Sequence, residues 1–159
     1  MRHEKFYSFA YRINELLCEY VNVHDDFFSR RFSIREIIPI PFIFKPIDYS
    51  IPVDKLDRII EQLTETRHEM EAYSEENGLG KHPFYITATR YVSLLCKAVK
   101  KLRDIQYKLH LKAQGEGSYS YKEYNKELDL YQSEVFGYSE FGNEFNKEFR
   151  NLRWRKDDC

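Results

Sequence analysis

The chain has 159 residues, a formal net charge of −1, and 42% hydrophobic against 32% charged residues. This length and balance suit one folded domain with one hydrophobic core, and they exclude a disordered chain. Six glycines are few for a turn-rich β-sandwich or barrel.

The first predicted helix covers roughly residues 3–28, where apolar side chains recur at three- and four-residue steps. These are Phe6, Phe9, Ala10, Ile13, Leu16, Leu17, Tyr20, Val21, Phe27 and Phe28. His24 lies within this stripe, one turn from Tyr20 and from Phe28. We therefore expect His24 to be a core or core-edge residue with one satisfied hydrogen bond.

Residues 29–52 form an unusual connector, with four prolines and the apolar run from Ile37 to Phe44. Proline excludes a regular helix, and the run is too apolar to lie free in water. We expect an extended strap packed along the bundle, with a short edge strand for self-pairing as the alternative. The most apolar window, from Ile37 to Ile47, is far shorter than a membrane span.

The second and third predicted helices cover roughly residues 53–77 and 83–114. Asn77-Gly78 ends the second helix, since glycine readily takes a left-handed cap. Pro83 suits the first turn of the third helix, and Gly115 follows its end. The short connection between the two helices predicts antiparallel neighbours.

The fourth predicted helix covers roughly residues 119–152. Ser120 and Glu123 have the spacing of a capping box, which satisfies two backbone donors at a helix start. The apolar stripe is dominated by rings: Tyr121, Tyr124, Leu128, Tyr131, Val135, Tyr138, Phe141, Phe145, Phe149 and Leu152. Together the four patterns predict an all-α fold, an antiparallel four-helix bundle with a Pro-rich connector between its first two helices, in a single domain over residues 1–159.

Charge is segregated along the chain. Residues 54–80 hold eight acids and three bases, whereas residues 81–117 hold eight bases and two acids. One interpretation is that the second and third helices neutralise one another across their shared edge. The other is that a basic face binds the phosphates of a nucleic acid through Arg90, Lys97, Lys101, Lys108 and Lys112.

Metal and cofactor signals are weak. Glu65 and His68 match one Glu-x-x-His motif, but helical spacing sets both outside the apolar stripe. The three cysteines lack metal-ligand spacing and indicate reduced thiols in a cytoplasm. We therefore expect no metal and no cofactor.

Arg103 and His110 are separated by six residues and share a face of the third helix. This pair resembles the Arg-x(4–6)-His signature of HEPN domains, which are helical bundles that often act as metal-independent ribonucleases. The resemblance covers these two residues and the size of the bundle. It implies that Arg103 would stabilise charge on a phosphate and His110 would act as acid or base.

The preferred hypothesis is a non-enzymatic interaction protein that binds a protein partner or itself, with a homodimer expected. It would use the Pro-rich strap or the rings of the fourth helix, represented by Tyr124, Tyr131, Tyr138, Phe141 and Phe145. The alternatives are a HEPN-like ribonuclease using Arg103 and His110, and a nucleic-acid-binding bundle using the basic face.

Overall fold

The computed structural model describes residues 2–31 and 48–157, with side chains for residues 4–29 and 48–152. All regular elements in these ranges are α-helices, and no strand occurs among them. The helices are α1 (Arg2–Arg31), α3 (Ser50–Glu76), α4 (Pro83–Ala113) and α5 (Tyr121–Asp157). The expected all-α class with four long helices is confirmed.

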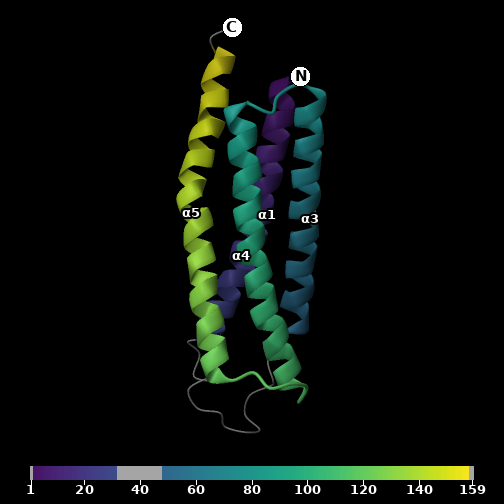
Figure 1. Cartoon of the computed structure of the whole chain (residues 1–159), viewed down its shortest axis with the longest axis vertical. Coiled ribbons are helices and arrows are strands. Elements are labelled where there is room, and N and C mark those ends of the chain that lie inside the picture. The colour runs from purple at the N-terminus through teal and green to yellow at the C-terminus, as the bar shows by residue number, and fades with distance from the viewer. Residues whose placement is uncertain (1, 32–47, 158–159) are drawn as a thin grey trace.

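The four helices lie side by side along one long axis (Figure 1). The start of α1 and the end of α5 lie at the same end of the molecule, where α3 also ends and α4 begins. Ion pairs agree with this course of the chain. Arg12 of α1 pairs with Glu65 and Glu69 late in α3, whereas Glu19 pairs with Arg58 early in α3.

The helix ends between α3 and α4 follow the local sequence signals. Gly78 has a φ of +63°, the left-handed conformation that favours glycine. Pro83 occupies the first turn of α4, where its missing N–H costs no hydrogen bond. His82 caps the same helix, since its Nδ1 accepts a hydrogen bond from the N–H of Phe84 at 3.3 Å.

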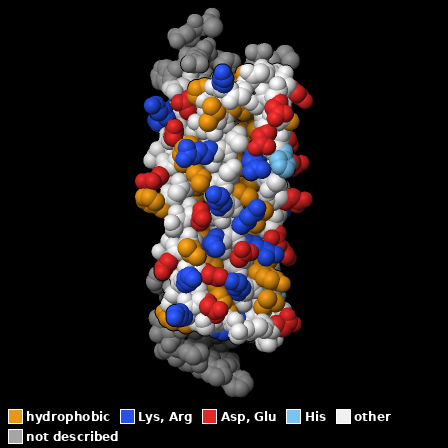
Figure 2. All heavy atoms as spheres, in the orientation of Figure 1, with side chains coloured by type: hydrophobic (Ala, Val, Ile, Leu, Met, Phe, Trp, Pro, Cys, Tyr) orange, Lys and Arg blue, Asp and Glu red, His pale blue; other side chains and the backbone are white. Residues whose placement is uncertain are grey.

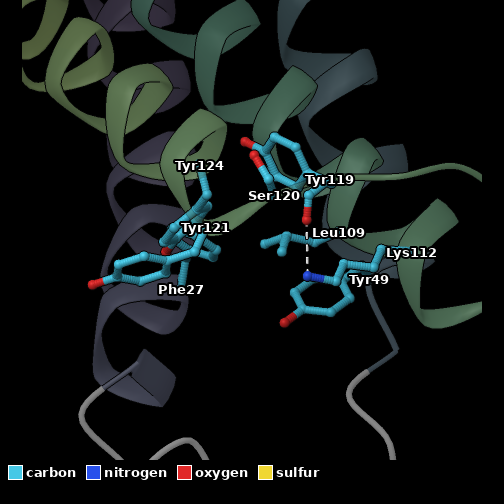
Figure 3. A pocket seen from close by; sticks show the side chains of 8 residues that line it. All are labelled: Phe27, Tyr49, Leu109, Lys112, Tyr119, Ser120, Tyr121 and Tyr124. Carbon is cyan, nitrogen blue, oxygen red and sulfur yellow. Dashed lines mark hydrogen bonds between the residues drawn. The ribbon is translucent and has the colours of Figure 1, made fainter.

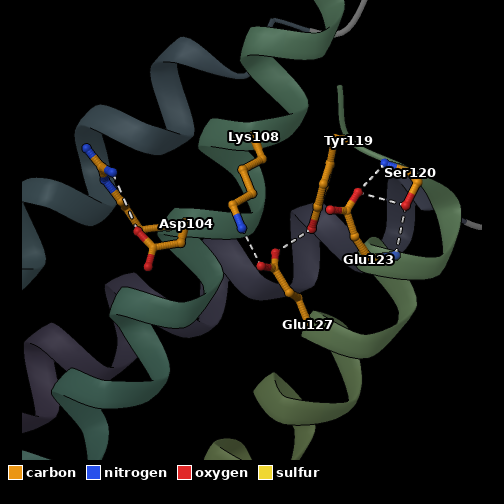
Figure 4. A network of polar contacts seen from close by, with 7 residues as sticks. Asp104, Lys108, Tyr119, Ser120, Glu123 and Glu127 are labelled. Atoms are coloured by element: carbon orange, nitrogen blue, oxygen red, sulfur yellow. Dashed lines mark hydrogen bonds and ion pairs between the residues drawn. The ribbon is translucent and has the colours of Figure 1, made fainter. Parts of the chain in front are cut away.

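The predicted capping box at the start of α5 is also confirmed (Figure 4). The Ser120 hydroxyl accepts from the N–H of Glu123 at 3.2 Å, and the Glu123 carboxylate accepts from the Ser120 N–H at 2.8 Å. The backbone and side-chain hydrogen bonds from Ser120 lower the pKa of Glu123. Two orphan backbone donors are therefore satisfied where the chain enters its longest helix.

The connector is shorter than expected. Residues 29–31 continue α1, and residues 50–52 already belong to α3. Pro52 fits there because the first turn of a helix does not need its N–H. The apolar run 37–44 lies outside the described residues. At the other end of the chain, α5 extends to Asp157, beyond the expected end at residue 152.

Buried side chains from all four helices form one core. Its largest fully buried members are Tyr20, Tyr131, Phe9, Phe84, Ile13, Leu56, Ile59, Leu63, Met70, Leu95, Leu102 and Ile105. Burying each such side chain stabilises the fold by about 1.5–3 kcal/mol. Along α5 the inward residues recur every seven positions, at Tyr124, Tyr131, Tyr138, Phe145 and Leu152, which is the repeat of gently supercoiled helices.

Charged residues occur along the whole length of each of these helices. Within residues 2–31 and 48–157, none of them combines the length and the apolar character that crossing a bilayer requires. The long α5, for example, is 37 residues long but has a mostly polar outer face.

Candidate functional site

The rings of α5 that we expected to contact a partner face mostly into the bundle. Tyr131, Tyr138 and Phe145 are buried, and Tyr124 and Phe141 are partly buried. The regular spacing of the rings in the sequence therefore identified the face of α5 that packs into the core. Only the edges of this stripe are open to a partner.

Contacts with α4 explain this burial. Phe145 stacks on Tyr91, with ring centroids 5.0 Å apart and an interplanar angle of 5°. The guanidinium of Arg90 lies 4.6 Å from the centre of the Phe141 ring. Gly142 lies against α4 as well, since a Cβ at this position would be 3.4 Å from a ring carbon of Tyr91, an ordinary van der Waals contact.

A polar cluster joins α1 to α5 inside the bundle. The Tyr20 and Tyr131 hydroxyl oxygens are 2.5 Å apart, and the Tyr131 oxygen is also 2.5 Å from Nδ1 of His24. His24 thus has the single hydrogen bond expected for a core-edge histidine. Burial raises the pKa of Tyr20, as does the neighbouring Tyr131, and burial also raises the pKa of Tyr131. These phenols stay protonated at neutral pH, so the Tyr20–Tyr131 pair acts as a structural link between α1 and α5.

The side of the bundle between α1 and α5 has a distinct composition. The backbones of these helices lie farther apart than those of α3–α4 or α4–α5, and rings fill the space between them. We define the α1–α5 face as the residues along this seam: Tyr7, Tyr11, Asn14, Cys18 and Val21 on α1, and Gln132, Val135, Phe136, Ser139, Asn143, Asn146 and Phe149 on α5. Tyr11 and Phe136 are 63% and 64% exposed.

The α1–α5 face has no charged member, and charges of opposite sign lie at its two ends. Exposed Asp25 and Asp129 follow it at one end, whereas exposed Lys147 and Arg150 lie at the other. The centre of a protein interface is typically depleted of charge and enriched in rings. The sequence prediction missed this face because its α1 half is a second, weaker row beside the main apolar stripe.

Basic side chains form an irregular column along the middle of the face seen in Figure 2, where α4 lies, with acidic side chains along both edges and a few among them. Three of the five predicted phosphate-binding residues have partners within the chain. Arg90 lies over Phe141, Lys108 forms an ion pair with Glu127, and Lys112 donates to the Tyr119 carbonyl. Lys97 is exposed and Lys101 is partly buried.

Arg103 and His110 share α4, as expected, but Arg103 is engaged within the bundle. Its Nε donates to a carboxylate oxygen of Asp57 at 2.8 Å, and a second guanidinium nitrogen lies 3.3 Å from the other oxygen. This bond to Asp57 raises the pKa of Arg103. A phosphate at this site would have to displace Asp57. His110 is partly buried near the end of the helix.

The residues of the Glu-x-x-His motif are exposed on α3, and Glu65 pairs with Arg12. Among the described residues, no group of three or more His, Cys, Asp or Glu side chains is placed to hold a metal ion. Cys18 and Cys96 are both free thiols.

A ring-lined pocket of about 220 Å³ occupies the end of the bundle where α4 meets α5 (Figure 3). The lining side chains are Phe27, Tyr49, Leu109, Lys112, Tyr119, Ser120, Tyr121 and Tyr124. Tyr119 donates to Glu127 at 2.7 Å, and Glu127 also pairs with Lys108 (Figure 4). These contacts fasten the connection between α4 and α5. We assign no ligand to the pocket, since residues 32–47, which join α1 to α3, lie outside the described residues.

The chain matches no protein-family model, no curated protein and no solved structure.

Proposed function

We propose that this chain is an interaction protein, an antiparallel four-helix bundle that pairs with a second copy of itself through the α1–α5 face. The observation that carries the proposal is the charge-free band of half-exposed and exposed rings along this face. Tyr11 and Phe136 are both more than 60% exposed there. Aromatic side chains contribute large contact areas to interfaces at low entropic cost.

Charge complementarity favours a second copy running in the opposite direction. The ring contact between Tyr7 and Phe149 places Arg150 level with the first turns of α1. Asp25 lies at the opposite end of the same face. A two-fold axis across the face would therefore bring Arg150 of one copy beside Asp25 of the other, and the reverse, as an isologous interface requires.

A matched pair of double variants tests this proposal. We expect the wild type to sediment as a dimer in analytical ultracentrifugation and the Tyr11→Ser/Phe136→Ser variant as a monomer. Ile86 and Leu130, 55% and 47% exposed, lie outside the face, so Ile86→Ser/Leu130→Ser is the control and should stay dimeric. A wild type that is monomeric at high concentration would rule out self-association.

The alternatives have less support in the described contacts. The ribonuclease hypothesis needs an Arg103 that can reach a phosphate, and Asp57 holds this side chain. The nucleic-acid hypothesis needs a free basic row, and Lys108 and Lys112 are engaged within the chain. The cysteine pattern supports a reducing, cytoplasmic location.

A further inference from the structure

A second surface feature lies away from the α1–α5 face, in the shallow groove between α3 and α4. The groove has a volume of about 220 Å³. Three cations line it: Arg67 from α3, and Lys97 and Lys100 from α4. Leu63 and Val92, both buried, contribute apolar side chains to its lining.

The charge of these three residues is poorly compensated. Lys97 and Lys100 are exposed, and neither forms an ion pair with another described residue. The Nε of Arg67 is buried and lies 3.4 Å from a carboxylate oxygen of Glu71, an ion-pair contact that lacks the geometry of a hydrogen bond. The charges of Lys97 and Lys100 are therefore open to an anion in the groove, and Arg67 lines the groove beside them.

The hydroxyl groups that line the groove are already used as hydrogen-bond donors within their own helices. The Thr64 hydroxyl donates to the Ile60 carbonyl at 2.8 Å, and the Ser93 hydroxyl donates to the Thr89 carbonyl at 2.9 Å. Their protons are therefore committed to their own helices. A ligand in the groove would therefore be recognised by the three cations, which favour negative charge and oxygen acceptors, the two properties of a phosphate group.

Carboxylates limit the size of the ligand. Arg103, one turn beyond Lys100 on α4, forms an ion pair with Asp57, and Arg67 forms one with Glu71. An extended polyanion along the groove would meet these carboxylates, whereas a compact anion would contact the three cations alone. We propose that the groove between α3 and α4 binds a compact phosphate compound, with Arg67, Lys97 and Lys100 as its ligands.

Calorimetric titration at low salt with two probes, inorganic pyrophosphate and phenyl phosphate, tests this site. Binding of pyrophosphate alone would identify a diphosphate site, and binding of phenyl phosphate as well would extend it to phosphate monoesters. We expect Lys97→Gln/Lys100→Gln to weaken binding at least about tenfold, since two of the three charge-assisted contacts are lost. Lys122→Gln/Lys126→Gln removes the same charge from exposed positions on α5 and should change the affinity less than about twofold.

The variants are also compared without ligand, by thermal unfolding. Lys97 and Lys100 repel one another across one helical turn, so their replacement should leave the melting temperature unchanged or raise it. The proposal is overturned if neither probe binds the wild type, or if the two double variants lose the same affinity. It is also overturned if single-stranded RNA binds more tightly than either probe and depends on Lys108 as well, since that result would indicate the basic column of α4.

Discussion

The hydroxyl oxygens of Tyr20 and Tyr131 lie 2.5 Å apart inside the bundle, although 111 residues separate the two tyrosines in the chain. This bond spans α1 and α5, whose backbones are held apart by rings. Apolar rings can slide along one another with little change in buried area, whereas a buried hydrogen bond has one geometry. The pair therefore fixes the position of α1 along α5.

Removing one hydroxyl of this pair should destabilise the fold. We expect Tyr20→Phe to lower the free energy of unfolding by about 1 kcal/mol, since a buried hydrogen bond is lost while the ring remains. Tyr85→Phe is the control, because the Tyr85 hydroxyl is buried without a hydrogen-bond partner. It should leave the stability unchanged or raise it. Urea denaturation measures both variants, and an equal loss in the two would contradict the structural role of the pair.

His24 should make the stability depend on pH. Burial lowers its pKa in the folded chain, and the charge of Asp25 opposes this shift only in part. Between the lowered pKa and the usual value of about 6.5, the unfolded chain binds more protons than the folded one. The free energy of unfolding should therefore rise with pH through this window and fall as the pH drops below about 6.5.

Variants separate this effect from the titration of other groups. The groups facing His24 are Tyr131 and Tyr20 in the cluster and Asp25 on its own helix. We expect His24→Gln to reduce the difference in thermal midpoint between about pH 7.5 and about pH 5.5. His68→Gln, at an exposed position of α3, should keep the wild-type difference. An unchanged difference in His24→Gln would exclude this residue as the source.

Local signals in the sequence predicted local structure well. The capping box of Ser120 and Glu123, the left-handed Gly78 and the initial Pro83 each depend on neighbours within four residues. Each signal acts through contacts between residues close in sequence, so it can be read without knowledge of the tertiary fold.

The candidate site was harder to predict because it depends on which faces cover one another. Periodicity grouped Tyr131, Tyr138 and Phe145 on one face, but only the positions of α1 and α4 show that this face is covered within the chain. The pairing of Arg103 with Asp57 likewise depends on the alignment of α3 and α4. The resemblance to a ribonuclease signature uses spacing along one helix and contains no information about a competing carboxylate.

The contact between Arg103 and Asp57 leads to a prediction about ribonuclease activity. A guanidinium held by a carboxylate is a poor ligand for a phosphate, since its donors are already used. We expect no difference between wild type and His110→Ala in a metal-free cleavage assay on labelled single-stranded RNA. Cleavage by the wild type that disappears in His110→Ala would contradict this and favour the HEPN-like alternative.

The proposed dimer can be tested through Cys18, which is exposed on the α1–α5 face. If Arg150 of one copy lies beside Asp25 of the other, the two-fold axis crosses α1 midway between the level of Tyr7 and Asp25. Cys18 lies two residues from that level, about 3 Å along the helix. The two Cys18 thiols would then be separated by only about 6 Å along the helix direction.

A short bis-maleimide should therefore cross-link two copies of the Cys96→Ser/Cys159→Ser variant. The matched control adds Cys18→Ser and Ser133→Cys, which moves the single thiol to an exposed position of α5 outside the face. It should give mainly monomer at the same concentration. Equal cross-linking of the two variants would indicate random collision and would remove the support for this orientation of the dimer.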